Sequence, residues 1–195
     1  MPGRRIATWE SIWLALYQQA HTLSLSGGRA NALGCAAATI VLAKVSWESY
    51  FHEFLERRRL TGDIKRLHFP SDLRTALERL GAPPPRFSKG EPWEQLALLN
   101  SLRNAIVHHD ATPRVLGAAR GDWYKRLIEL GVISAASDAT WESCVLTPAV
   151  ARWACTVVGT SIIRAESIPH GRTRSLNSVK EPLTALLESL PSEPS

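Results

Sequence analysis

The chain has 195 residues, of which 45% are hydrophobic and 21% charged, with a net charge of +5 and a sequence pI of about 9.4. This length and composition indicate one globular domain with a single core and exclude a disordered or fibrous protein. The basic balance favours a polyanionic partner such as RNA, DNA or an anionic surface, without choosing among them.

The cysteines and the apolar runs indicate in which compartment of the cell the protein lies. Cys35, Cys144 and Cys155 form no Cys-x-x-Cys pair, which argues against a disulfide framework and against a zinc knuckle. The opening MPGRRIATWESIW lacks the apolar segment of a secretory signal, and the longest apolar run, residues 32–43, is too short to span a bilayer. We therefore expect a cytoplasmic protein without a membrane segment.

Two helices are predicted in the first third of the chain. Apolar residues recur at steps of three and four over residues 8–25, which predicts an amphipathic helix. A longer helix is predicted over 29–60: its first half is small and apolar, as in a surrounded central helix, and its second half is amphipathic. Its arginine run, residues 57–59, is predicted to be a solvated helix end that complements the helix dipole.

The rest of the chain predicts more helix and two irregular segments. Further helical patterns lie at 71–80, which Gly81 would stop, and at 92–110, 121–132 and 148–167. Residues 132–146 match neither a helical nor a strand pattern clearly, and a small β-hairpin is one expectation for them. Residues 169–195 are predicted to be a basic, flexible tail. The predicted fold is all-α, an up-and-down bundle with long central helices over residues 1–168.

The segment LRNAIVHHD, residues 102–110, places polar groups in the last turns of an apolar helix. Asn100, Asn104 and His108 are spaced four apart, so they form a stripe beside the apolar face, and Arg103 lies at the border of that face. Because Arg103 is about 140° around the helix from His108, a second copy of the chain across a two-fold axis would complete such a site.

These residue types suit phosphate chemistry without a metal. A guanidinium presents a planar fork to phosphate, and an imidazole both takes and gives a proton near neutral pH. In RNA a 2′-hydroxyl lies beside each phosphate, so a base and a charge stabiliser are enough for internal transesterification. Neither a carboxylate cluster for magnesium nor a zinc spacing is present, and we expect no metal or cofactor.

A purely structural interpretation stays open beside this one. Arg103 at the edge of an apolar stripe is often an ion-pair partner, and Glu48 or Glu53 on the long second helix could serve as its counter-charge. A histidine near a helix end is often a cap or a surface group. The adjacent His109 points away from the asparagine stripe, and a metal site at HHD is disfavoured because neighbouring histidines on a helix diverge.

The same residues resemble the Arg-x4-His signature of HEPN domains. In LRNAIVHHD the arginine is followed by a polar residue, and AKVSWESYFHEFLE on the preceding long helix is similar to the aromatic-acidic stretch of RiboL-PSP-HEPN proteins. The resemblance covers roughly residues 8–166. The extra His109 leaves open which histidine is used, and residues 132–146 have no counterpart.

The resemblance implies an all-α bundle that forms a homodimer through the 92–110 helix. It implies a metal-independent endoribonuclease, often a toxin or phage-defence effector with an antitoxin or other partner protein. Arg103 would stabilise the phosphorane, Asn104 would help to position it and His108 would act as acid or base, with Asn100 and His109 binding substrate. Some members have lost catalysis, so a non-catalytic module for RNA binding, nucleotide binding or dimerisation is the alternative.

Overall fold

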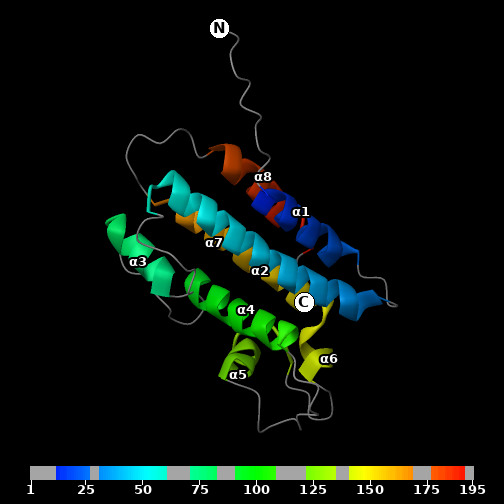
Figure 1. The fold of residues 1–195 in the computed structure, drawn as a ribbon. Helices are drawn as coiled ribbons and strands as arrows, with labels where there is room; N and C mark the ends of the chain where they lie inside the picture. Colours follow the sequence, from blue (N-terminus) through cyan, green and yellow to red (C-terminus); the bar gives the residue numbers. More distant parts are fainter. Residues whose placement is uncertain are drawn as a thin grey trace.

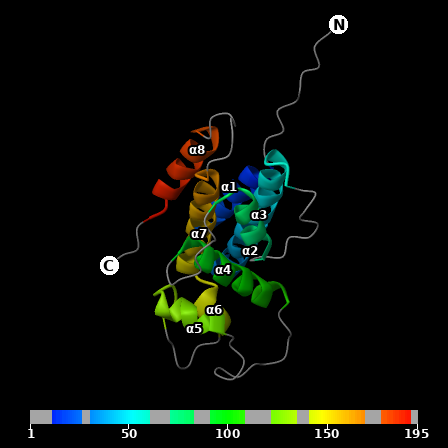
Figure 2. The ribbon, with the colours of Figure 1, turned by 90° about the vertical axis from the view of Figure 1, so that its left-hand side faces the viewer.

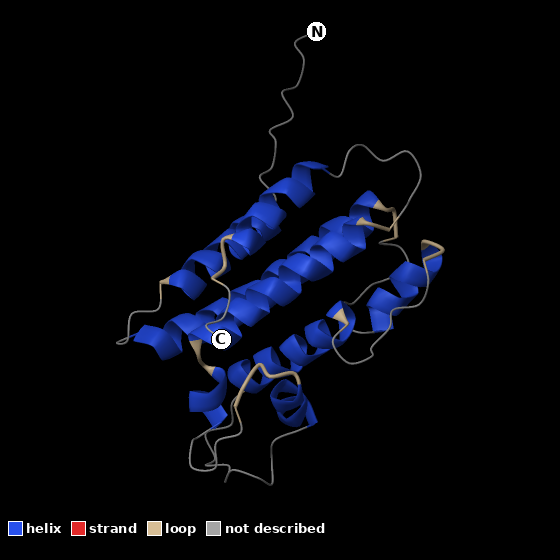
Figure 3. Cartoon of the chain, turned by 180° about the vertical axis from the view of Figure 1, so that it is seen from behind, coloured by secondary structure: helices blue, strands red, loops and turns tan. Residues whose placement is uncertain are grey.

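The computed structural model describes residues 12–26, 31–60, 71–82, 91–108, 122–134, 141–168 and 177–191. Within these ranges the chain is an all-α bundle, as predicted, and Figure 3 shows helices and no strand in the described parts. The helices in chain order are α1 (Ile12–Leu25), α2 (Ala32–Arg57), α3 (Ser71–Arg79), α4 (Pro92–Val107), α5 (Asp122–Glu129), α6 (Trp141–Val145), α7 (Pro148–Glu166) and α8 (Asn177–Glu188).

The long helices α2 and α7 pack together at the centre of the bundle (Figures 1 and 2). Helix α1 contacts both of them, α4 also contacts both, α5 packs on α4, and α8 packs on α7. None of the helices in the described ranges combines the length and the apolar character that a membrane crossing requires. The core is therefore built around two helices that are nearly surrounded by others.

Aromatic contacts fix the neighbours of α2. The Trp47 ring lies 6.1 Å from the Trp93 ring of α4 and stacks on Phe51 at 5.6 Å, measured between centroids. Trp13 of α1 meets Tyr50 edge-on at 5.4 Å. Aromatic side chains bury large areas and prefer these offset or edge geometries. The second half of α2 therefore holds α1 and α4 in place.

Three helix ends share one capping geometry. Arg59, Gly81 and Gly131 have positive φ values of 57°, 66° and 72°. At each, the backbone N–H of this residue and the next bond back to the last turn, as in Leu60 N to Leu55 O at 2.9 Å and Ala82 N to Leu77 O at 2.9 Å. The prediction that Gly81 stops its helix is confirmed.

The β-hairpin expected near 132–146 is wrong over the residues that the structure describes. The N–H groups of Val132 and Ile133 both bond to Leu127 O, at 2.9 and 3.4 Å, so they cap α5 and cannot donate to a strand. On the other side, residues 141–145 form α6, which buries Val145 completely. Residues 135–140 lie outside the described ranges.

The flexible tail expected at 169–195 differs from the structure over α8. This helix packs on α7 and buries Leu183 completely. On α1, His21 Nε2 lies 2.9 Å from Leu186 O and 3.0 Å from Ser189 Oγ. A short amphipathic segment gives only a weak helical pattern in the sequence. The apolar face of α8 is stabilised here by its contact with the rest of the bundle.

The arginine run at the end of α2 is only partly solvated. Arg57 forms an ion pair with the fully buried Glu166 of α7, and Arg58, which is 4% exposed, lies 3.9 Å from the same carboxylate. Arg58 also donates to Ile168 O at 3.3 Å and lies over the Phe54 ring. The prediction of a solvated helix end is therefore wrong for Arg58, whose charge is compensated across the α2–α7 contact.

We expect Arg59→Gly to raise the free energy of unfolding by about 0.5–1 kcal/mol, because glycine carries no Cβ penalty at positive φ although it loosens the unfolded chain. Arg59 is exposed at the end of α2. Urea unfolding monitored by circular dichroism measures the change. The matched control is Gly81→Ala, which should lower stability by about 1 kcal/mol at a position with open space around the new Cβ. Equal stability of both variants and wild type contradicts the capping account.

We expect Gly159→Ala to destabilise the protein by about 1–3 kcal/mol, since overpacking forces neighbours to shift. A Cβ at Gly159 of α7 would lie 2.6 Å from Tyr17 Oη and 3.0 Å from Leu187 of α8. Gly34→Ala is the control: it lies exposed on α2 with nothing within 4 Å of the new Cβ. It should raise stability by up to about 1 kcal/mol. An unchanged Gly159→Ala melting temperature argues against the α7–α8 contact.

Candidate functional site

Helix α4 presents the two stripes that its sequence predicts. Leu96, Leu99 and Leu102 are completely buried, and Ile106 packs against the core from a half-buried position. Because these side chains recur every three or four residues, they hold one face of the helix in the bundle. The neighbouring asparagine stripe is thereby turned toward solvent at the end of the helix.

Arg103 and Asn104 form a pair at the border of the buried face. The Arg103 side chain is half-buried, and its Nη1 donates to Asn104 Oδ1 at 3.0 Å. Its Nε is buried without a hydrogen-bond partner, and Asn104 is exposed. Buried polar groups are usually hydrogen-bonded, and Arg103 Nε is one of several described side-chain atoms, Tyr50 Oη and Arg58 Nη1 among them, that lack a partner.

The structural ion-pair interpretation of Arg103 is wrong for the described residues. The two carboxylates considered as its partners are taken by other cations: Glu48 accepts from Lys44 Nζ at 2.8 Å, and Glu53 lies 3.6 Å from Arg57 Nε. Among the described residues no carboxylate forms an ion pair with Arg103. Its guanidinium therefore keeps a full charge to offer to an anion.

His108 ends α4 and is accessible. Its backbone N–H donates to Asn104 O at 2.9 Å, and its side chain is exposed. Asn100, one turn before Asn104, is half-buried. His109, predicted to bind substrate, lies outside the described residues. The structure thus joins Arg103 to Asn104 directly and places His108 one turn further on, with no bond between its imidazole and Arg103 in the described part of the chain.

Lys44 of α2 is a charged neighbour of this site that the sequence analysis missed. It is 1% exposed although it is a lysine, and its ammonium donates to Glu48, whose side chain is 38% exposed. Burial lowers the pKa of Lys44, the bond to Glu48 opposes that effect, and the charge of Arg103 lowers the pKa further. The lone lysine inside the apolar run VLAKVSW was the available signal.

The donor set suits an anion more than a cation. Arg103 and Asn104 supply N–H groups, and the carboxylates considered as partners of Arg103 are engaged by Lys44 and Arg57. Within the described ranges no group of three or more histidine, cysteine, aspartate or glutamate side chains could hold a metal ion. Cationic forks and amides of this kind bind phosphate oxygens through charge-assisted hydrogen bonds.

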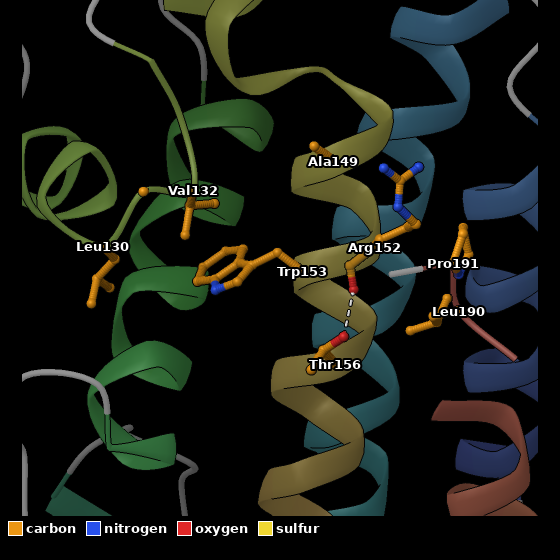
Figure 4. A pocket seen from close by; sticks show the side chains of 9 residues that line it. Leu130, Val132, Ala149, Arg152, Trp153, Thr156, Leu190 and Pro191 are labelled. Carbon is orange, nitrogen blue, oxygen red and sulfur yellow. Dashed lines mark hydrogen bonds between the residues drawn. The ribbon is translucent and has the colours of Figure 1, made fainter. Parts of the chain in front are cut away.

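A separate pocket of about 270 Å³ is lined by residues of α7, of the turn after α5 and of the end of α8 (Figure 4). Trp153 and Arg152 line it, and Trp153 Nε1 donates to Gln95 Oε1 of α4 at 3.0 Å. Arg103, Asn104 and His108 do not belong to its lining. This pocket is therefore separate from the residues predicted to form the site.

Comparison of the chain with protein-family models, with curated proteins and with solved structures gave no match.

We expect Arg103→Met to leave the free energy of unfolding unchanged within about 0.5 kcal/mol or to raise it, because methionine removes an unsatisfied buried N–H. Glu166→Gln is the contrasting variant. It leaves the buried Arg58 without its counter-charge and Arg57 with Glu53 alone, and it should cost roughly 3 kcal/mol. Thermal and urea unfolding of both proteins make the comparison. A large loss of stability in Arg103→Met favours a structural role for this arginine.

Proposed function

We propose that the protein is a metal-independent endoribonuclease of HEPN type. The observation that carries the proposal is Arg103: a half-buried guanidinium with an orphaned Nε, bonded to a neutral amide and to no carboxylate in the described residues. An uncompensated cation at the surface of a basic protein favours a polyanionic ligand. The exposed amide of Asn104 binds this guanidinium, and His108, one turn further along the chain, has an exposed imidazole; the proposed RNA cleavage uses both groups.

Each residue has a role in the proposed reaction. His108 takes the proton of a ribose 2′-hydroxyl, and the oxygen attacks the adjacent phosphorus. Arg103 stabilises the negative charge that gathers on the phosphorane oxygens. Asn104 holds the guanidinium through Oδ1, which leaves its NH₂ group to donate to a phosphate oxygen. The protonated His108 returns its proton to the departing 5′-oxygen, which gives a 2′,3′-cyclic phosphate and a 5′-hydroxyl.

A homodimer through α4 belongs to the same proposal. Val107, between Asn104 and His108 in sequence, is 47% exposed although it is apolar. A second copy that covers Val107 would bring its own arginine and histidine to the same cleft. This arrangement would pair Arg103 of one subunit with the imidazole of the other, which the single chain does not do. A toxin or phage-defence role with a protein antitoxin is the biological setting that the HEPN resemblance implies.

A non-catalytic RNA-binding or nucleotide-binding module is the second candidate. It is favoured by the lack of any bond between His108 and Arg103 in the described residues, since a binding site needs the charge of Arg103 but no proton transfer by His108. Binding without product formation would identify it.

The test is RNA cleavage in excess EDTA by wild type, His108→Ala and Arg103→Ala. We expect wild type to cut RNA and to spare DNA of the same sequence, and each variant to lose about 10²–10⁴-fold in rate. The control is His52→Ala, which removes an exposed histidine of α2. Gel electrophoresis and end-group analysis of the products provide the readout. Wild type that cleaves no faster than His108→Ala would rule out the nuclease.

A further inference from the structure

The pocket of Figure 4 has one face of α7 as its floor. Ala149, Arg152, Trp153 and Thr156 recur at steps of three and four along this helix, so they share that face. The turn after α5 lies on one side of the floor and the end of α8 on the other. The volume of about 270 Å³ is just below the usual range for ligand pockets, about 300–1,000 Å³, so the pocket suits one small molecule.

The two walls of the pocket are apolar and their backbone donors are used. In the turn after α5, the N–H groups of residues 130–132 all bond back to carbonyls of α5. At the end of α8, the Leu190 N–H bonds to Leu187 O at 3.2 Å, and Pro191 carries no N–H. A molecule between the walls therefore meets apolar side chains and none of these N–H groups.

The floor carries an aromatic ring whose polar atom is also used. Trp153 Nε1 donates to Gln95 Oε1 of α4 at 3.0 Å, which fixes the orientation of the indole. Figure 4 shows this indole on the side of the floor that faces Val132. Thr156 Oγ1 donates to Arg152 O at 3.1 Å, so the hydroxyl can only accept from a ligand. This side of the pocket favours a flat apolar ring, which packs well on an indole.

Arg152 supplies the charge of the pocket. Its side chain is half-buried, and among the described residues no carboxylate forms an ion pair with it. Figure 4 shows this side chain running back toward Ala149 in the first turn of α7, as helical side chains generally do. The positive end of the helix dipole lies in the same turn. This end of the pocket therefore favours an anionic group.

We propose that the pocket binds a small aromatic carboxylate, with its ring against Trp153 and its carboxylate on Arg152. A guanidinium donates two parallel N–H groups to a carboxylate, and the other side-chain donors of the floor are spent on the protein. Sugars and nucleotides fit this set less well, because the apolar walls leave their many polar groups without partners. The proposal goes beyond RNA cleavage, since none of the proposed catalytic residues lines the pocket.

Titration of the full chain with indole-3-acetate tests the proposal, with the indole N–H signal of Trp153 followed by NMR. Comparison with Trp153→Phe assigns this signal. We expect the signal to shift with a Kd of about 1 mM or lower, as for a compact ligand of this size. Indole-3-acetamide has the same ring and no charge, and it should bind about tenfold more weakly because it lacks the charge-assisted bonds to Arg152.

Variants of α7 separate the charge of the pocket from its shape. Arg152→Met should weaken binding of indole-3-acetate about tenfold and leave binding of indole-3-acetamide unchanged. Arg164→Met removes the same charge from an exposed position of α7 and should keep both affinities within about twofold of wild type. Thr156→Trp, also at an exposed position, fills the pocket and should abolish both. Thermal unfolding checks that each variant is folded, and Arg152→Gln replaces Arg152→Met if the latter does not fold.

Four results overturn the proposal. They are a Kd for indole-3-acetate above about 10 mM, equal affinities for the acid and its amide, an unchanged preference for the acid in Arg152→Met, and tighter binding of adenosine monophosphate than of indole-3-acetate. The last result would assign the pocket to a nucleotide. Because these titrations contain no RNA, failure of the nuclease proposal leaves their outcome unaffected, and the reverse holds as well.

Discussion

The packing of α4 against the second half of α2 is the constraint on which the rest of the site depends. The Trp47 ring of α2 contacts the Trp93 ring of α4, and Leu96, Leu99 and Leu102 of α4 are completely buried. Lys44 lies one turn before Trp47 on α2 and is almost completely buried, and its ammonium pairs with Glu48 on the same helix. The same packing of α4 buries one face of that helix and leaves Arg103 half-buried at the border of this face.

The buried and half-buried charges of this bundle are of two kinds. At the carboxyl ends of α2 and α7, Glu166 is fully buried, and Arg57 and Arg58 surround it with opposite charge, so the cluster joins two helices. At the end of α4, Arg103 has an amide for a neighbour and an orphaned N–H. Buried side-chain atoms without a partner occur in both places, since Arg58 Nη1 and Glu166 Oε2 have none either. The two arginine sites differ in charge compensation: the α2–α7 cluster holds a buried carboxylate, whereas Arg103 forms no ion pair with a carboxylate among the described residues.

The predictions that depend on periodicity were confirmed, and those that depend on distant contacts were not. The apolar stripe of α4 and the glycine stop after α3 follow from spacing and from backbone geometry, which are local properties. The hairpin near 132–146 was wrong where the structure describes it, because capping hydrogen bonds after α5 decided that segment. Within the segment expected to be a flexible tail, α8 packs on α7. His109 and Asp110, the end of the motif, lie outside the described residues.

The sequence by itself determined that the chain forms long amphipathic helices and that asparagine, arginine and histidine share the exposed end of one of them. These are consequences of 3.6 residues per turn and require no knowledge of neighbours. Only the tertiary structure decided that Arg103 is left without a carboxylate among the described residues and that Glu166 takes two arginines of α2. Ion pairing depends on distances between helices that are far apart in sequence, and helix packing sets those distances.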